Sequence, residues 1–208
     1  MLNRKCIRYA LSFFLLALVT GCQQLPQKIP VQFSPQQQSQ AQLNQWLLSG
    51  KVGIRLNKQA SRADILWQQQ PNHYELSLQG PFGSGALQLI GTPEQATLIT
   101  AEGTQHAPNA EMLIKQQLGW TVPIEYLTWW AKGLPTPDLP LQGNATYDEQ
   151  HHLIAFVQDN WTITLAEYKT TSTDNSAIST IELPYRITLN KASLRLTLVI
   201  AEWKNLNF

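Results

Sequence analysis

From about Trp46 onward, apolar and polar residues alternate with a period of two, which is the pattern of a β-strand with one buried face. Successive segments of this kind follow one another closely, as in antiparallel sheets whose strands are joined by hairpins. The alternation therefore predicts a mainly β fold of about ten or eleven antiparallel strands. Its clearest apolar positions include Leu48, Val52, Ile54, Ile65, Trp67, Leu76 and Leu78.

Two stretches interrupt the alternation with helical spacing. Residues 109–118 begin at a plausible N-cap, Asn109, and end before Gly119. Residues 123–132 have proline near the first helical position and Gly133 directly after the last. Both patterns predict short helices. The apolar face of the sheet can then be covered in two ways, as a sandwich or as a barrel that curls and is closed by the two helices, and the barrel leaves room for a cavity.

The N-terminus has the pattern of a signal peptide, with basic residues, an apolar run over residues 11–19 and a small–small–Cys ending. The apolar run is too short to span a bilayer as a helix. Its ending resembles a bacterial lipobox, which predicts a lipoprotein signal over residues 1–21 and lipid attachment at Cys22. Because Gln23 and not Asp follows the cysteine, the sorting rule for such lipoproteins favours a lipid anchor in the outer membrane, on its periplasmic face.

Residues 22–42 are rich in Gln and Pro and show no hydrophobic period, which is typical of a flexible tether. A flexible coil of this length reaches roughly 25 Å. Loss of Arg4, Lys5 and Arg8 with the signal takes the 15 basic residues to 12 against 14 acidic ones, a formal charge of −2. This charge balance gives no indication of a surface that binds nucleic acid.

Residues that could carry catalysis are few. Cys6 leaves with the signal and Cys22 is consumed by acylation, so the mature chain has no free thiol. The sequence has neither a Gly-rich phosphate loop nor the G-x-S-x-G turn of hydrolases. We therefore expect no enzyme activity, no cofactor and no metal site. The histidines, which we expect in exposed turns or strands, are His73, His106, His151 and His152.

The seven tryptophans are the unusual part of the composition. Tryptophan fills protein cores and also lines surfaces near membranes. Two interpretations therefore stay open: the tryptophans pack an ordinary core, or some of them line a pocket of lipid size together with the inward aliphatic residues.

Several short motifs occur in a fixed order. They are the lipobox, the Gln-rich stretch, Trp67-Gln68-Gln69 at the end of a strand, Pro81-Phe82-Gly83 between two strands, and residues 129–135, WWAKGLP, at the end of the second helix. Each motif is short, but their order resembles the family of the outer-membrane lipoprotein receptor LolB. The resemblance covers residues 43–208, which we expect to form a LolB-like lipoprotein-binding domain.

The resemblance implies an incomplete, open antiparallel β-barrel lidded by short helices around a hydrophobic cavity. It also implies that the cavity accepts the acyl chains of lipoproteins delivered by the periplasmic carrier LolA, and that the chain inserts this cargo into outer-membrane phospholipid without a nucleotide. We expect a monomer. The apolar residue of the turn, Phe82 here and commonly Leu in the family, would touch the bilayer, where burial of its side chain gains roughly 1.5 to 3 kcal/mol.

Alternation and helical stripes together predict which residues face the cavity, although a shift of one residue in register would invert the choice. Two other functions remain open: a structural lipoprotein with a filled core, and a hydrolase acting on lipid or peptidoglycan, which the residue inventory does not support. The predicted cavity-lining residues are Val52, Ile54, Ile65, Trp67, Leu76, Leu78, Leu127 and Trp130.

Overall fold

The structure is a computed structural model that describes residues 31–81, 85–174 and 180–207. Cys22 and Phe82, the two residues predicted to meet the membrane, lie outside these ranges. No helix among the described residues is long and apolar enough to cross a membrane.

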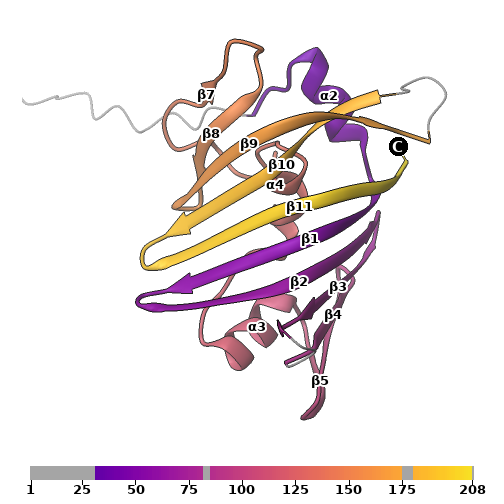
Figure 1. The fold of residues 1–208 in the computed structure, drawn as a ribbon, viewed down its shortest axis with the longest axis vertical. Helices are drawn as coiled ribbons and strands as arrows, with labels where there is room; N and C mark the ends of the chain where they lie inside the picture. Colours follow the sequence, from indigo (N-terminus) through magenta and orange to yellow (C-terminus); the bar gives the residue numbers. More distant parts are fainter. Residues whose placement is uncertain (1–30, 82–84, 175–179, 208) are drawn as a thin grey trace, which may run out of the picture.

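Eleven strands of the described chain form one antiparallel sheet in the order β6-β5-β4-β3-β2-β1-β11-β10-β9-β8-β7 (Figure 1). The first and last strands of the chain, β1 and β11, pair in the middle, while β6 and β7 are the two edges, so the sheet is not closed. The predicted fold class is confirmed. The strands are β1 Gln45–Leu56, β2 Gln59–Gln70, β3 His73–Gln79, β4 Leu87–Gly91, β5 Ala96–Thr100, β6 Gly103–Ala107, β7 Thr146–Tyr147, β8 Leu153–Gln158, β9 Trp161–Ser172, β10 Thr180–Lys191 and β11 Leu194–Asn207.

Both predicted helices are present, as α3 Ala110–Leu118 and α4 Ile124–Ala131. The side chain of Asn109 accepts a hydrogen bond from the backbone N–H of Met112, and Gly119 ends α3 in the left-handed region. The two helices belong to the segment that connects the edge strands β6 and β7, and they lie on one side of the curved sheet (Figure 1). Of the two ways to cover the apolar face, the structure therefore has a single sheet with a helical lid.

The central strands approach each other closely at Gly50. A β-carbon there would lie 2.2 Å from the carbonyl oxygen of Val199, so only glycine fits. The pairing of β1 with β11 shifts register at this point, between Ser49 and Gly50. Such a bulge bends the strand and increases its twist, which helps the sheet to curve around the helices.

The predicted tether is wrong for residues 35–42, which form helix α2 (Pro35–Gln42) on the folded domain. Ser34 and Gln37 form a reciprocal capping box, in which each side chain accepts from the backbone N–H of the other residue. The side-chain amide of Gln40 donates to the backbone oxygen of Glu182 in β10, at 2.8 Å. The folded part of the chain therefore begins before the alternation does.

Lys132 joins this N-terminal segment to the helical lid. Its ammonium group is buried, donates to the backbone oxygen of Leu43 at 2.8 Å and lies 4.4 Å from the ring centre of Trp129. Burial lowers the pKa of Lys132 to about 8. The ring of Phe33 stacks on Trp129 from the other end of the segment, with 5.9 Å between ring centres.

His152 is not an exposed histidine, contrary to the expectation from sequence. Its Nδ1 lies 2.9 Å from a carboxylate oxygen of Asp148 and its Nε2 lies 3.1 Å from one of Glu182, while its ring stacks on Tyr168. Burial acts to lower the pKa of His152, but the hydrogen bonds to the two carboxylates outweigh it and raise the pKa above its ordinary value. Gln36 of α2 also donates to Glu182, so this cluster ties α2 to β10.

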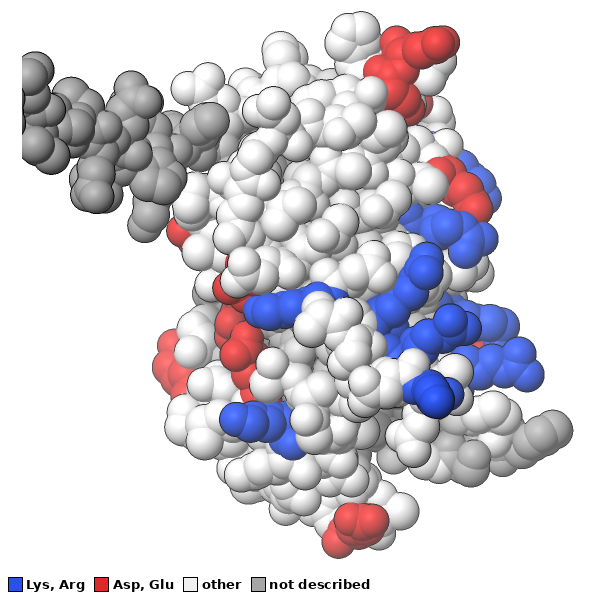
Figure 2. Space-filling model, turned by 90° about the vertical axis from the view of Figure 1, so that its left-hand side faces the viewer, with Lys and Arg blue, Asp and Glu red and all other residues white. Residues whose placement is uncertain are grey.

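Charges are spread unevenly over the surface. Several Lys and Arg side chains gather on the right of Figure 2, while much of the remaining face carries neither charge. Acidic groups collect near the helical lid, where burial and the neighbouring carboxylates of Glu125 and Asp159 raise the pKa of Glu111.

Candidate functional site

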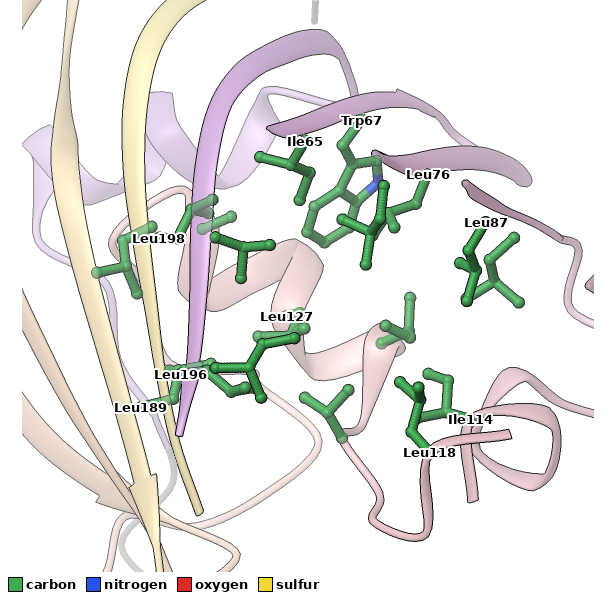
Figure 3. A pocket seen from close by; sticks show the side chains of 18 of the residues that line it. Ile65, Trp67, Leu76, Leu87, Ile114, Leu118, Leu127, Leu189, Leu196 and Leu198 are labelled. Atoms are coloured by element: carbon green, nitrogen blue, oxygen red, sulfur yellow. The ribbon is translucent and has the colours of Figure 1, made fainter. Parts of the chain in front are cut away.

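A cavity lies between the inner face of the sheet and the helices α3 and α4 (Figure 3). Its empty space is about 800 Å³, including the part that opens to solvent. Every lining residue is aliphatic or tryptophan. The sheet contributes Val52, Ile54, Ile65, Trp67, Leu76, Leu78, Leu87, Leu89, Ile187, Leu189, Leu196 and Leu198, and the helical segment contributes Ile114, Leu118, Trp120, Val122, Ile124, Leu127 and Ala131.

Strand register explains why the wall from the sheet is continuous. Val52 and Ile54 of β1 stand opposite Leu198 and Leu196 of β11. On the other side of β1, the pairing of β2 with β3 puts Ile65 opposite Leu78, and Trp67 opposite Leu76 in the same way. Because paired residues point to the same face of a sheet, the apolar positions of neighbouring strands merge into one surface.

Seven of the eight residues predicted to face the cavity lie on its wall, and Trp130 is the exception. The prediction missed the contributions of β4, β10, β11 and the segment around α3. For the strands a signal was present, since Leu87, Leu89, Leu196 and Leu198 continue the same alternation. The seven residues are Val52, Ile54, Ile65, Trp67, Leu76, Leu78 and Leu127.

Trp130 is not part of the cavity wall and is fully buried. Its indole nitrogen donates to Oε1 of Gln158 at 3.1 Å, and its ring centre is 6.2 Å from that of Trp161. Gln158 is fully buried and also bonds the backbone of Thr136 and Leu139, at 2.8 to 2.9 Å. The prediction is wrong for Trp130 because a helical stripe does not show where a cavity ends.

The chemistry of the wall is that of a binding site for apolar groups. None of its residues carries a titratable or nucleophilic side chain. The indole N–H of Trp67 is buried and finds no acceptor among the described residues. In the described part of the chain, no group of three or more His, Cys, Asp or Glu residues could hold a metal ion. The cavity can therefore exclude water around hydrocarbon, and it offers no group for acid–base or nucleophilic catalysis.

Comparison with known proteins relates this architecture to a family. The family model described as "LolB: Outer membrane lipoprotein LolB" matches residues 44–203. A relative named "Outer-membrane lipoprotein LolB" from Pseudomonas syringae pv. syringae is 35% identical over 206 residues, which cover 95% of this chain and 96% of the relative. Another of that name, from Cellvibrio japonicus, is 39% identical over 170 residues, or 81% of each chain.

Among solved structures, a LolA superfamily protein from Nitrosomonas europaea is 8% identical to this chain, with a TM-score of 0.49 over 85% of this chain and 96% of that one. The sequence relatives are named for an outer-membrane lipoprotein and not for an enzyme. The match over residues 44–203 and the identities over most of the chain show the family directly. This chain belongs to the LolB family of outer-membrane lipoproteins.

Proposed function

We propose that this lipoprotein accepts other lipoproteins from the carrier LolA by taking their acyl chains into the cavity, and then inserts them into the outer membrane. One observation carries the proposal: a cavity between sheet and helices whose nineteen lining side chains are all aliphatic or tryptophan. Shelter from water is worth about 0.8 kcal/mol for each methylene group of an acyl chain.

Transfer needs no energy source if each acceptor binds the cargo more tightly than the donor does. A wall of aliphatic and tryptophan side chains suits an intermediate acceptor, because contacts with hydrocarbon hold an acyl chain without fixing its position. The bilayer is the final acceptor, since it buries the whole acyl chain.

The membrane contacts of the proposal rest on two residues. Acyl chains on Cys22 would hold the protein at the periplasmic face of the outer membrane, and Phe82 would enter the bilayer surface during delivery. Because α2 is bound to the domain, the predicted tether would shorten to the stretch between Cys22 and Phe33, whose length at full extension is about 40 Å. The domain, a monomer in this proposal, can thus reach the bilayer surface while it remains anchored.

The first experiment follows a labelled lipoprotein. LolA loaded with the label is mixed with this protein, and liposomes are added afterwards. We expect the label to move to this protein and then to the liposomes. Ile54→Trp replaces an aliphatic side chain of the cavity wall by a larger indole ring. It should reduce capture tenfold or more while the chain stays folded. Capture that is unchanged in this folded variant would contradict the proposal.

A second experiment separates capture from delivery. Phe82→Glu should capture the label from LolA at the normal rate but release it to liposomes more slowly, because a carboxylate does not enter hydrocarbon. If the folded variant releases the label to liposomes at the normal rate, Phe82 has no role in delivery. The role of the cavity would be unaffected by this result.

A further inference from the structure

Four positive side chains occupy the outer, convex side of the central strands. Arg55 in β1 stands directly opposite Arg195 in β11. Arg62 in β2 pairs with Gly53, the neighbouring outward position of β1, and Lys58 lies in the turn between β1 and β2. All four side chains are exposed. We call this group, Arg55, Lys58, Arg62 and Arg195, the basic face.

The basic face is not neutralised by the protein itself. Among the described residues, its four side chains take part in no ion pair or hydrogen bond, whereas Arg186 pairs with Glu167 at 2.7 Å and Lys204 with Glu202 at 2.8 Å. Like charges directly opposite on neighbouring strands are destabilising. The overall composition does not impose this cluster, because acidic residues nearly balance basic ones in the whole chain. An anion bound across the strands would remove the repulsion.

The place of the basic face in the fold indicates which anion it meets. Gln79, the last residue of β3, pairs with Asp64, two residues from Arg62. The turn that contains Phe82 starts directly after Gln79. On the other side, the backbone N–H of Asn57 donates to the backbone oxygen of Ser193, which holds the ends of two hairpins side by side. The basic face therefore lies near the end of β3, where the segment that contains Phe82 begins.

We propose that the basic face binds the headgroups of anionic phospholipids and so directs the turn after β3 onto the membrane. This inference rests on the proposed function, which brings that turn to the bilayer. Guanidinium groups bind phosphate oxygens in a forked geometry, and basic residues near an anionic membrane add attraction that weakens beyond a Debye length. Headgroups move freely in the plane of the membrane, so they can match charges spread over three strands without a preformed pocket.

Vesicle binding tests the proposal on the mature chain with Cys22→Ala, which removes the predicted acylation. Vesicles contain phosphatidylcholine alone or with phosphatidylglycerol, and the bound fraction is measured by sedimentation. Arg55→Gln combined with Arg195→Gln should weaken binding to the anionic vesicles about tenfold or more and leave binding to neutral vesicles unchanged. Raising the salt concentration should abolish the preference of the parent chain for anionic vesicles.

Arg186→Gln combined with Lys204→Gln is the matched control, because it removes the same net charge from two side chains that already have carboxylate partners. It should bind anionic vesicles within about threefold of the parent chain. Thermal unfolding checks that each variant is folded. If the arginine pair cannot be replaced without unfolding, Arg62→Gln alone should still weaken anionic binding by about threefold to fivefold.

Three results would overturn the inference: equal binding of parent and arginine variant to anionic vesicles, equal losses in variant and control, or normal vesicle binding together with slow capture from LolA. The last result would mean that the basic face meets an acidic protein. Capture from LolA without vesicles tests the proposed function separately. If the parent chain fails to capture the lipoprotein from LolA but still binds anionic vesicles, the proposed function is contradicted. The basic face would then remain a membrane contact.

Discussion

Two regions of the same sheet bury their inner faces in different ways. Over β1 to β4, β10 and β11, with α3 and the start of α4 above, apolar side chains line both walls and leave a cavity; we call this region the hollow half. Over β8 and β9, with the end of α4 above, Trp130 and Trp161 fill the space and Gln158 bonds the backbone across it; we call this the filled half. Alternation along a strand decides which face of the sheet is buried. Whether a cavity remains over that face depends on the volumes of the side chains that pack against it from the helices.

Loss of the hydrogen bonds made by Gln158 in the filled half should have the largest effect on stability. Gln158→Leu leaves the indole N–H of Trp130 and backbone groups of Thr136 buried without partners, and it removes the hydrogen bond to the backbone oxygen of the half-buried Leu139. We expect the free energy of unfolding to fall by about 4 kcal/mol or more. Denaturant titration measures it, and Gln68→Leu at an exposed position of β2 should change it by less than about 0.5 kcal/mol. If Gln158→Leu also lowered the free energy of unfolding by less than about 0.5 kcal/mol, the role of Gln158 in the filled half would be contradicted.

The same truncation in both halves sharpens the comparison. Leu165 in β9 and Leu196 in β11 are both buried, but only Leu196 faces the cavity. Leu165→Ala should cost about 3 to 5 kcal/mol, because it opens a void in packed surroundings. Leu196→Ala should cost about 1 to 2 kcal/mol, because part of its surface already lacks neighbours. Equal costs, measured by denaturant titration, would mean that the cavity wall is as tightly packed as the filled half.

Lys132 should make stability depend on pH at high pH. Its ammonium group loses the proton near pH 8 in the folded chain, against 10.5 in the unfolded chain. Between these values the unfolded chain binds more protons, so the free energy of unfolding rises with pH, by about 3 kcal/mol at most. Lys132→Met should lack this rise. Stability curves of the two proteins that run parallel from pH 8 to 10.5 would refute the assignment.

His152 should give a smaller effect of the opposite sign. Its pKa is raised in the fold, so its contribution to stability is complete below the ordinary value of 6.5 and disappears as the pH rises through the raised value. His152→Gln should flatten the stability curve above pH 6.5, where the wild-type contribution is lost. NMR titration of the ring gives the pKa directly, and a value at or below 6.5 would contradict the carboxylate contacts. The cavity wall has no titratable group, so capture of acyl chains should not follow either titration.

How far the sequence predicted this structure differs between the two halves. In the hollow half, alternation placed Val52, Ile54, Ile65 and Trp67 on the inner face. In a strand, the apolar or polar character of each residue indicates which face of the sheet its side chain points to. Pairing of the first strand with the last was not predictable from alternation, since this contact joins residues far apart in the chain. The wall from β11 was therefore not assigned to the cavity.

Around the filled half, prediction failed where local patterns meet tertiary packing. Leu127 and Trp130 belong to one apolar stripe of α4, yet only Leu127 reaches the cavity. Helix α2 was missed because its composition is that of a disordered segment. A local signal existed in Ser34-Pro35-Gln36-Gln37, which has the spacing of a capping box with proline at the first helical position. Contacts with β10 and Lys132 then hold a helix that is weak on its own.

The most direct test of the central claim is photo-crosslinking with a lipoprotein whose acyl chains carry a diazirine. After transfer from LolA and illumination, mass spectrometry identifies the modified residues. The account predicts adducts on the cavity wall, at Ile54, Leu127 and Leu198, and none at Trp130 or Leu165 in the filled half. Adducts confined to the outer surface, or spread equally over both halves, would contradict it.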